Sequence, residues 1–141
     1  MGSGIAAQIA NADLPVLLLD LPAKTAGQPH AAAAAIDRLL VSDPPQLMQK
    51  KRAQLITTGT IDDDFDKLAD CDLIIEAVIE QLPVKQALYK RLHQTISPHC
   101  IVTSNTSTIP ISLLVAEMPV DFARRFAITH YFNPVRFMRL L

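Results

Sequence analysis

The chain has 141 residues, 50 % of them hydrophobic and 19 % charged, and this composition is typical of one folded domain with a sizeable core. Its 13 Lys and Arg residues are balanced by 14 Asp and Glu residues, which leaves a formal net charge of -1 at pH 7. Because such a charge gives no general attraction to a phosphate backbone or an anionic lipid surface, we expect neither nucleic acid nor membrane as a partner.

The apolar stretches are short. Val16–Leu19 and Ala31–Ile36 fall well below the roughly 18 residues that a membrane-spanning helix needs. The first residues show no basic segment followed by a long apolar one, so no export signal is indicated and a cytoplasmic location is expected. Cys71 and Cys100 have neither the spacing of a metal site nor that of a disulfide framework. We expect both to be small buried side chains and expect no metal site.

Short apolar runs alternate with segments of helical period along the whole chain. In chain order we expect an opening helix, a strand at 16–20, helices at 30–41 and 45–53, strands at 54–57 and 72–78, a helix at 83–95, a strand at 100–103, a helix at 111–116 and a strand at 126–129. Continuously apolar strands that alternate with helices are typical of a parallel sheet covered on both faces. The sequence therefore predicts an α/β fold with a Rossmann-like, doubly wound parallel sheet.

Prolines mark the helix boundaries. Pro44 and Pro45 divide the region before residue 54 into two helices, because proline lacks an N–H and clashes with the preceding turn. Pro83 fits the first turn of the helix at 83–95. Apolar residues then recur at helical spacing and predict one stripe that packs on the sheet: Val84, Ala87, Leu88, Leu92 and Ile96. The cationic residues between them are expected to face water: Lys85, Lys90 and Arg91.

The opening segment Met1-Gly-Ser-Gly-Ile-Ala leads through a helix to a strand that ends in Asp20. This order matches the second half of a dinucleotide-binding fingerprint, in which the helix N-terminus faces a pyrophosphate and the acid accepts hydrogen bonds from a ribose. On these residues alone, an equally good interpretation makes Gly2 and Gly4 ordinary capping glycines and Asp20 a turn residue.

Two further strands lead into polar groups. Glu76 lies within the strand at 72–78 and Glu80 follows it, at the carboxyl end where parallel sheets bind ligands. Alternatively, Glu80 only favours the positive end of the next helix, and Glu76 is a paired or rim carboxylate. The strand at 100–103 leads into Ser104-Asn-Thr-Ser-Thr, a turn able to bind a sugar or substrate hydroxyl. On these residues alone, ordinary turn chemistry is the favoured interpretation.

The last strand leads into His130-Tyr-Phe-Asn-Pro. A histidine at the end of an apolar strand, followed by an asparagine and a proline, is a suitable arrangement for a general base at the rim of a cleft. A lone histidine is more often structural, and that alternative stays open on these residues alone. The other histidines have no such context and are assigned no role: His30, His93 and His99.

Together, these stretches resemble the NAD-binding domain of the L-3-hydroxyacyl-CoA dehydrogenases, the oxidising enzymes of fatty-acid β-oxidation. Nearly the whole chain takes part in the resemblance, and the last two stretches are the most specific. The matching stretches are Met1-Gly-Ser-Gly-Ile-Ala, Leu17-Leu-Leu-Asp20, Asp72-Leu-Ile-Ile-Glu-Ala-Val-Ile-Glu80 with Lys85 after it, Ser104-Asn-Thr-Ser107 and His130-Tyr-Phe-Asn-Pro134.

The resemblance implies NAD as the cofactor and 3-hydroxyacyl-CoA or 3-ketoacyl-CoA as the substrate. The cofactor-binding residues that it implies are Gly2, Asp20, Ala77, Glu80, Lys85, Ser107 and Asn133. Among them, Asp20 would bind the adenosine ribose, and Ser107 would touch both the nicotinamide and the substrate hydroxyl. His130 would be the catalytic base, with Ser107 as the second catalytic residue.

The chain also departs from the family pattern. Its fingerprint begins at the last glycine, so the first strand of the family fold, which lies between the strands at 16–20 and 72–78, is expected to be missing and to leave both neighbours unpaired. The Glu that follows the catalytic His in the family lies beyond Leu141, as does the C-terminal helical domain. We therefore expect residues 1–141 to be a partial Rossmann domain of a homodimeric parent, inactive alone and binding NAD weakly at best.

Two alternatives remain on the sequence alone. In the first, the chain is the NAD(P)-binding domain of another β-hydroxyacid dehydrogenase. In the second, it is a nucleotide-binding or structural module without catalysis. The first alternative is disfavoured by the His-x-x-Asn-Pro pattern at the strand end, because those enzymes typically use a lysine as the base.

Overall fold

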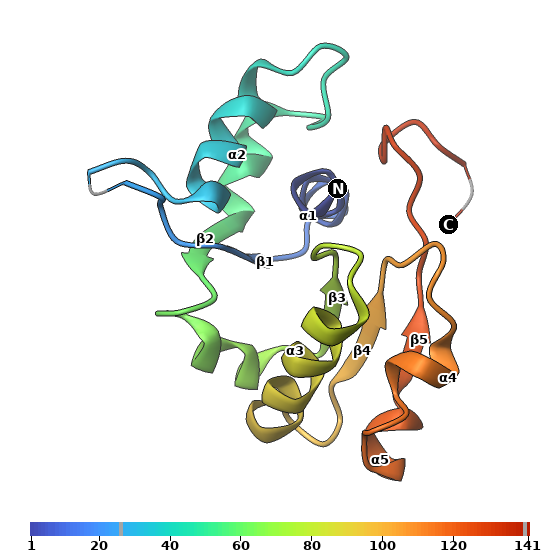
Figure 1. Ribbon diagram of the computed structural model, residues 1–141. Helices are drawn as coiled ribbons and strands as arrows, with labels where there is room; N and C mark the ends of the chain where they lie inside the picture. The colour runs from blue at the N-terminus through green and yellow to red at the C-terminus, as the bar shows by residue number, and fades with distance from the viewer. Residues whose placement is uncertain (26, 140) are drawn as a thin grey trace. The chain divides into compact units, whose positions relative to one another are not determined.

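The computed structural model describes residues 1–25, 27–139 and 141, and their elements are drawn in Figure 1. The chain divides into two units. The first holds Met1–Phe65 and the segment that begins at Tyr131, and the second holds Asp66–His130. No helix in the described residues combines the length and the apolar character needed to cross a bilayer.

The first unit is a two-stranded parallel sheet with two helices. Its elements are α1 (Gly2–Asn11), β1 (Val16–Asp20), α2 (Ala31–Val41), the 3-10 helix η1 (Lys50–Leu55) and β2 (Ile56–Thr60). The register places Val16 opposite Ile56 and Asp20 opposite Thr60. Alanines on α1 allow a close approach to α2 and to β2, and the buried core contains Ala6, Ala7, Ala10, Leu39, Leu47 and Ile56.

The second unit is a three-stranded parallel sheet in the order β3-β4-β5. After the 3-10 helix η2 (Phe65–Asp70) come β3 (Leu73–Glu76), α3 (Leu82–Thr95), β4 (Ile101–Ser104), the short helices α4 (Ile111–Leu114) and α5 (Val120–Ala123), and β5 (Phe126–Ile128). Aromatic rings join these elements: the Tyr89 ring on α3 meets the Phe126 ring on β5 edge-on, with centroids 5.0 Å apart. Phe122 of α5 lies 6.0 Å from Phe126.

The expected α/β fold with parallel strands is confirmed. The strands form two sheets rather than one, because in the described part of the chain β1 is hydrogen-bonded to β2 alone and β3 to β4 alone.

The predicted helix at 45–53 is wrong. Residues 45–49 form no helix, η1 covers Lys50–Leu55, and β2 begins at Ile56 rather than at 54. The backbone of this segment is bound instead by the buried side chain of Asn11. Its amide donates to the Gln46 carbonyl oxygen at 2.9 Å, and its oxygen accepts from the Met48 N–H at 2.8 Å. A side chain more than thirty positions away thus replaces the hydrogen bonds that a helix would supply.

The buried face of α3 also differs from the predicted stripe. Leu92 and Ile96 are buried as expected, whereas Val84 and Ala87 are exposed. Lys85 was expected to face water, but it is buried, because its ammonium group pairs with the carboxylates of Glu76 and Glu80. Cys100 is buried as expected, but Cys71 is only half-buried.

The Asn11 contacts generate a stability prediction. Asn11→Ala removes two hydrogen bonds and leaves the Gln46 carbonyl and the Met48 N–H without these partners. We expect the free energy of unfolding to fall by about 1–3 kcal/mol. Urea unfolding followed by circular dichroism measures it, with the exposed Gln49→Ala of the same segment as control. Equal stability of the two variants would contradict the role given to Asn11.

Candidate functional site

The parallel register of β3 and β4 places Glu76 level with Ser104 at the carboxyl ends of both strands. Glu76 is only 3 % exposed. Its Oε1 accepts from the Lys85 Nζ and the Val78 N–H, and its Oε2 accepts from the Tyr89 hydroxyl and the Ser104 hydroxyl, each at 2.7 Å. Four donors saturate this carboxylate, as a buried charged group requires.

Lys85 joins two carboxylates. It lies in the first turns of α3, one helical turn before Tyr89, so both side chains point toward the end of β3. Its Nζ is 2.7 Å from Glu76 Oε1 and 3.3 Å from Glu80 Oε2, and the residue is 1 % exposed. A buried ammonium needs such partners, since an unpaired one would lose its proton or destabilise the fold.

Glu80 binds the turn that follows β4. Its Oε1 accepts hydrogen bonds from the Thr106 hydroxyl, from the Thr108 hydroxyl at 3.1 Å, and from the Ser107 and Thr108 N–H groups at 3.3 and 3.4 Å. The side chain is nevertheless 38 % exposed, so it borders solvent. One carboxylate therefore ties the β3–α3 turn to the turn that carries Ser107.

This environment keeps Glu80 ionised. Burial acts to raise its pKa, but the hydrogen bonds from Thr106 and Lys85 and the lysine charge outweigh that effect and lower the pKa to about 2. Tyr89 behaves oppositely. Burial raises the pKa of its phenol, and the hydrogen bond to Glu76 adds to the increase, so the hydroxyl stays a donor at neutral pH.

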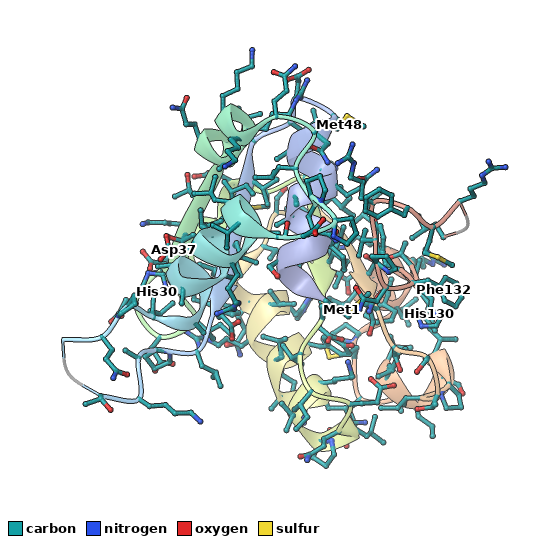
Figure 2. All side chains as sticks on the ribbon, turned by 90° about the horizontal axis from the view of Figure 1, so that it is seen from above. Met1, His30, Asp37, Met48, His130 and Phe132 are labelled. Atoms are coloured by element: carbon teal, nitrogen blue, oxygen red, sulfur yellow. The ribbon has the colours of Figure 1, made fainter. Side chains whose placement is uncertain are left out.

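His130 follows β5 at the same edge of the sheet. The register sets Ile128 opposite Ser104. Thr129 then donates its N–H to the Ser104 carbonyl oxygen at 3.0 Å, and its hydroxyl donates to the Thr103 hydroxyl oxygen at 2.9 Å. These bonds fix the backbone that leads into His130, which is half-buried and is labelled in Figure 2.

The second unit thus brings five of the predicted site residues to the carboxyl ends of three adjacent parallel strands. Ala77 and His130 are half-buried, Lys85 is buried, and Glu80 and Ser107 are exposed. The carboxyl edge of a parallel sheet is where α/β proteins bind ligands. The alternative that Glu80 only stabilises the positive end of the following helix does not account for its hydrogen bonds to the 106–108 turn.

The remaining predicted residues belong to the first unit. Gly2 is half-buried in the first turn of α1, and Asn133 is exposed. Asp20 is exposed at the carboxyl end of β1, and its Oδ1 accepts from the Leu21 N–H at 2.7 Å.

Sequence reasoning missed several partners in this site. The hydroxyls of Tyr89, Ser104 and Thr106 were given no role as donors to Glu76 or Glu80. One signal was available: Lys85 and Tyr89 are polar-tipped residues four positions apart that follow a strand with an internal Glu. His30, given no role, caps α2 through its Nδ1, which accepts from the Ala33 N–H at 3.3 Å (Figure 2).

The described residues offer no metal site, and the first unit has a surface pocket. Across residues 1–25, 27–139 and 141, no three His, Cys, Asp or Glu side chains are grouped to hold a metal ion. A surface pocket of about 200 Å³ occurs in the first unit, lined by Asp13, Lys51, Arg52, Gln54 and Leu55. None of the predicted site residues lines this pocket, so we place the candidate site at the strand ends instead.

Comparison with known proteins decides the family. Residues 1–141 match the family model described as "3-hydroxyacyl-CoA dehydrogenase, NAD binding domain". The chain belongs to this family. The resemblance inferred from the sequence is confirmed, and neither alternative is favoured.

Relatives and solved structures agree with this family. A probable 3-hydroxyacyl-CoA dehydrogenase of Deinococcus radiodurans is 43 % identical over 143 residues, which cover 100 % of this chain and 41 % of that protein. A putative fatty acid oxidation complex trifunctional enzyme of Rickettsia felis is 41 % identical, with 100 % and 20 % covered. The crystal structure of 3-hydroxybutyryl-CoA dehydrogenase from Escherichia coli K12 aligns with a TM-score of 0.82 and 33 % identity, covering 99 % of this chain and 29 % of that one. The chain spans less than half the length of these proteins.

The Glu80 contacts predict a pH dependence. A lowered pKa means that Glu80 contributes stability above pH 4.5, its ordinary pKa, and that this contribution is lost as the pH falls toward about 2. Thr106→Val removes a hydroxyl donor, so the Glu80 pKa should rise toward 4.5. Carbon-13 NMR titration of the Glu80 carboxyl measures this shift.

Ser107→Ala is the matched control, because it alters the same turn and keeps the Ser107 N–H that Glu80 binds. Its Glu80 titration should match that of the wild type. A wild-type Glu80 that titrates near pH 4.5 would contradict the assigned contacts.

Proposed function

We propose that residues 1–141 are the NAD-binding part of an enzyme that oxidises L-3-hydroxyacyl-CoA to 3-ketoacyl-CoA in fatty-acid β-oxidation. The observation that carries the proposal is the placement of Glu80, Ser107 and His130 at the carboxyl ends of β3, β4 and β5. A carboxylate can bind the ribose hydroxyls of the cofactor, a hydroxyl can bind the substrate oxygen, and an imidazole can accept the substrate proton. A cytoplasmic location and a homodimeric assembly stay predictions.

The polar groups at the strand ends are suited to NAD. Ribose hydroxyls donate hydrogen bonds to carboxylates, and Asp20 and Glu80 are exposed carboxylates at strand ends. Glu80 is ionised and lies beside the hydroxyl-rich turn of Ser107 and Thr108, which offers further hydrogen bonds to a nicotinamide ribose or amide. We assign cofactor contacts to Gly2, Asp20, Ala77, Glu80, Ser107 and Asn133. Lys85, for which the resemblance also implies a contact, is 1 % exposed.

Lys85 contributes to this site through Glu80. Its ammonium group is buried between the Glu76 and Glu80 carboxylates, so it stabilises the charge and the position of Glu80 beside the 106–108 turn.

Each catalytic residue then has a defined task. NAD, when bound, supplies the acceptor for the hydride that leaves the substrate carbon. His130 takes the proton of the substrate hydroxyl on its imidazole nitrogen, because an imidazole can both accept and release a proton. The Ser107 hydroxyl hydrogen-bonds the substrate oxygen and orients it toward His130.

Ligand-dependent stability tests the binding half of the proposal. NAD and acetoacetyl-CoA at millimolar concentration should each raise the melting temperature of the chain, because a ligand that binds only the folded state stabilises it. Stabilisation by NAD alone would indicate a dehydrogenase for another substrate, and stabilisation by neither would overturn the proposal. Differential scanning fluorimetry measures both.

A pair of variants locates the effect. Asp20→Asn should weaken the NAD-induced shift, because an amide is a poorer acceptor for ribose hydroxyls than a carboxylate. Asp37→Asn changes an equally exposed acid on α2 and should leave the shift intact.

The catalytic half needs an enzyme of full length. In a chimera that carries this chain in place of the matching part of the Deinococcus radiodurans relative, His130→Gln should lower kcat by about 10²–10⁴-fold. The Kd for NADH should stay nearly unchanged, because the imidazole acts on the substrate proton. His99→Gln, on an exposed residue, is the control. A lost NADH affinity with a preserved kcat would contradict the role of His130.

A further inference from the structure

Glu76 is a buried carboxylate that the proposed reaction does not use. Its four donors come from different parts of the second unit: the turn after β3 (Val78), two successive turns of α3 (Lys85 and Tyr89) and the end of β4 (Ser104). It is thus the point where the strand ends and the helix are joined.

The two oxygens of Glu76 serve different neighbours. Oε2 binds the Tyr89 and Ser104 hydroxyls, which lie in the interior. Oε1 binds Lys85, whose ammonium also lies 3.3 Å from Glu80 Oε2. Oε1 is therefore the oxygen that is linked, through Lys85, to the exposed Glu80.

The contact between Lys85 and Glu80 determines what Glu80 can hold. With its Oε2 directed to the ammonium, Glu80 presents Oε1 to the Thr106 hydroxyl and to the N–H groups of Ser107 and Thr108. Without Glu76, Lys85 would be a buried cation with one partially exposed partner, and it would gain by moving toward solvent. Glu80 and the turn would then lose their fixed position.

We propose that Glu76 is a positioning residue of the NAD site, which acts through Lys85 to hold Glu80 and the turn that carries Ser107. This inference rests on the proposed function, because it assigns that site to NAD. Because Glu76 is only 3 % exposed, this role requires no direct contact between Glu76 and the cofactor or the substrate.

Two substitutions separate the two oxygens. Glu76→Gln keeps one acceptor oxygen but removes the negative charge that binds Lys85. Tyr89→Phe keeps Lys85 paired and removes one hydrogen bond from the interior side. Both should lower the melting temperature, so loss of stability alone cannot explain a difference between them.

The experiment measures NAD affinity and backbone exchange in the full chain. NAD is titrated calorimetrically at a fixed interval below the melting temperature of each variant, and hydrogen exchange is recorded at the Ser107 and Thr108 amides. Glu76→Gln should raise the Kd for NAD by about tenfold or more and accelerate exchange at both amides. Tyr89→Phe should change the Kd by less than about twofold.

Lys90→Met is the control. Lys90 lies on α3, as Lys85 and Tyr89 do, but the substitution breaks only its exposed ion pair with Glu117 and leaves the buried groups unchanged. It should leave both the Kd and the exchange rates at their wild-type values.

Two results would overturn the inference: a Glu76→Gln chain that binds NAD as the wild type does, or Kd changes that follow the melting temperature equally in both variants. If Glu76→Gln does not fold, the double variant Glu76→Gln/Lys85→Met replaces it, because it leaves no unmatched buried charge. Fast exchange at Ser107 and Thr108 in that variant supports the inference, and wild-type protection refutes it. A wild type that fails to bind NAD refutes the proposed function instead, while the exchange data still decide the role of Glu76.

Discussion

The ion pair between Lys85 and Glu76 is the interaction on which the second unit depends. Neither group is exposed by more than 3 %, and each would be costly to bury without the other. Removing one member of a buried pair destabilises a protein by about 3–5 kcal/mol, whereas an exposed pair such as Lys90–Glu117 contributes about 0–1 kcal/mol. The same pair places Glu80, so stability and site geometry share one origin.

Parallel strand pairing explains why the polar groups meet. Because β3, β4 and β5 run in the same direction, the residues that follow each strand emerge at one edge of the sheet. The register sets Glu76 beside Ser104 and Ser104 beside Ile128, so the turns that follow carry Glu80, Ser107 and His130 to that edge. Segments separated by more than twenty residues thereby contribute to one site.

Much of this arrangement was predictable from the sequence. β1 was predicted with its observed bounds, and α2 and α3 within one residue at each end, because apolar period and proline position act locally. Of the residues named for the site in the second unit, Ala77, Glu80, Ser107 and His130 follow the ends of strands, whereas Lys85 lies on α3. Those predictions depended on local pattern and on the resemblance of whole motifs.

The errors arose where a distant side chain decides the outcome. The segment at 45–49 has helical period, but its hydrogen bonds go to Asn11 in another element. Lys85 has the spacing of a solvent-facing cation, and its burial is explained by its two carboxylate partners, Glu76 at the end of β3 and Glu80 in the turn that follows. Such pairings cannot be predicted from hydrophobic periodicity, because periodicity reflects only the spacing of residues within one element. The short helix α5 was missed because a single turn of four residues carries too little pattern.

The most direct test of the central claim is to map NAD onto the chain by two-dimensional NMR of its backbone amides. The account predicts that NAD shifts the amide signals of Ala77, Glu80, Ser107 and Leu21, which lie at the ends of β3, β4 and β1. If the shifts were confined to the surface pocket lined by Asp13, Lys51, Arg52, Gln54 and Leu55, and the strand ends were unchanged, this expectation would be contradicted.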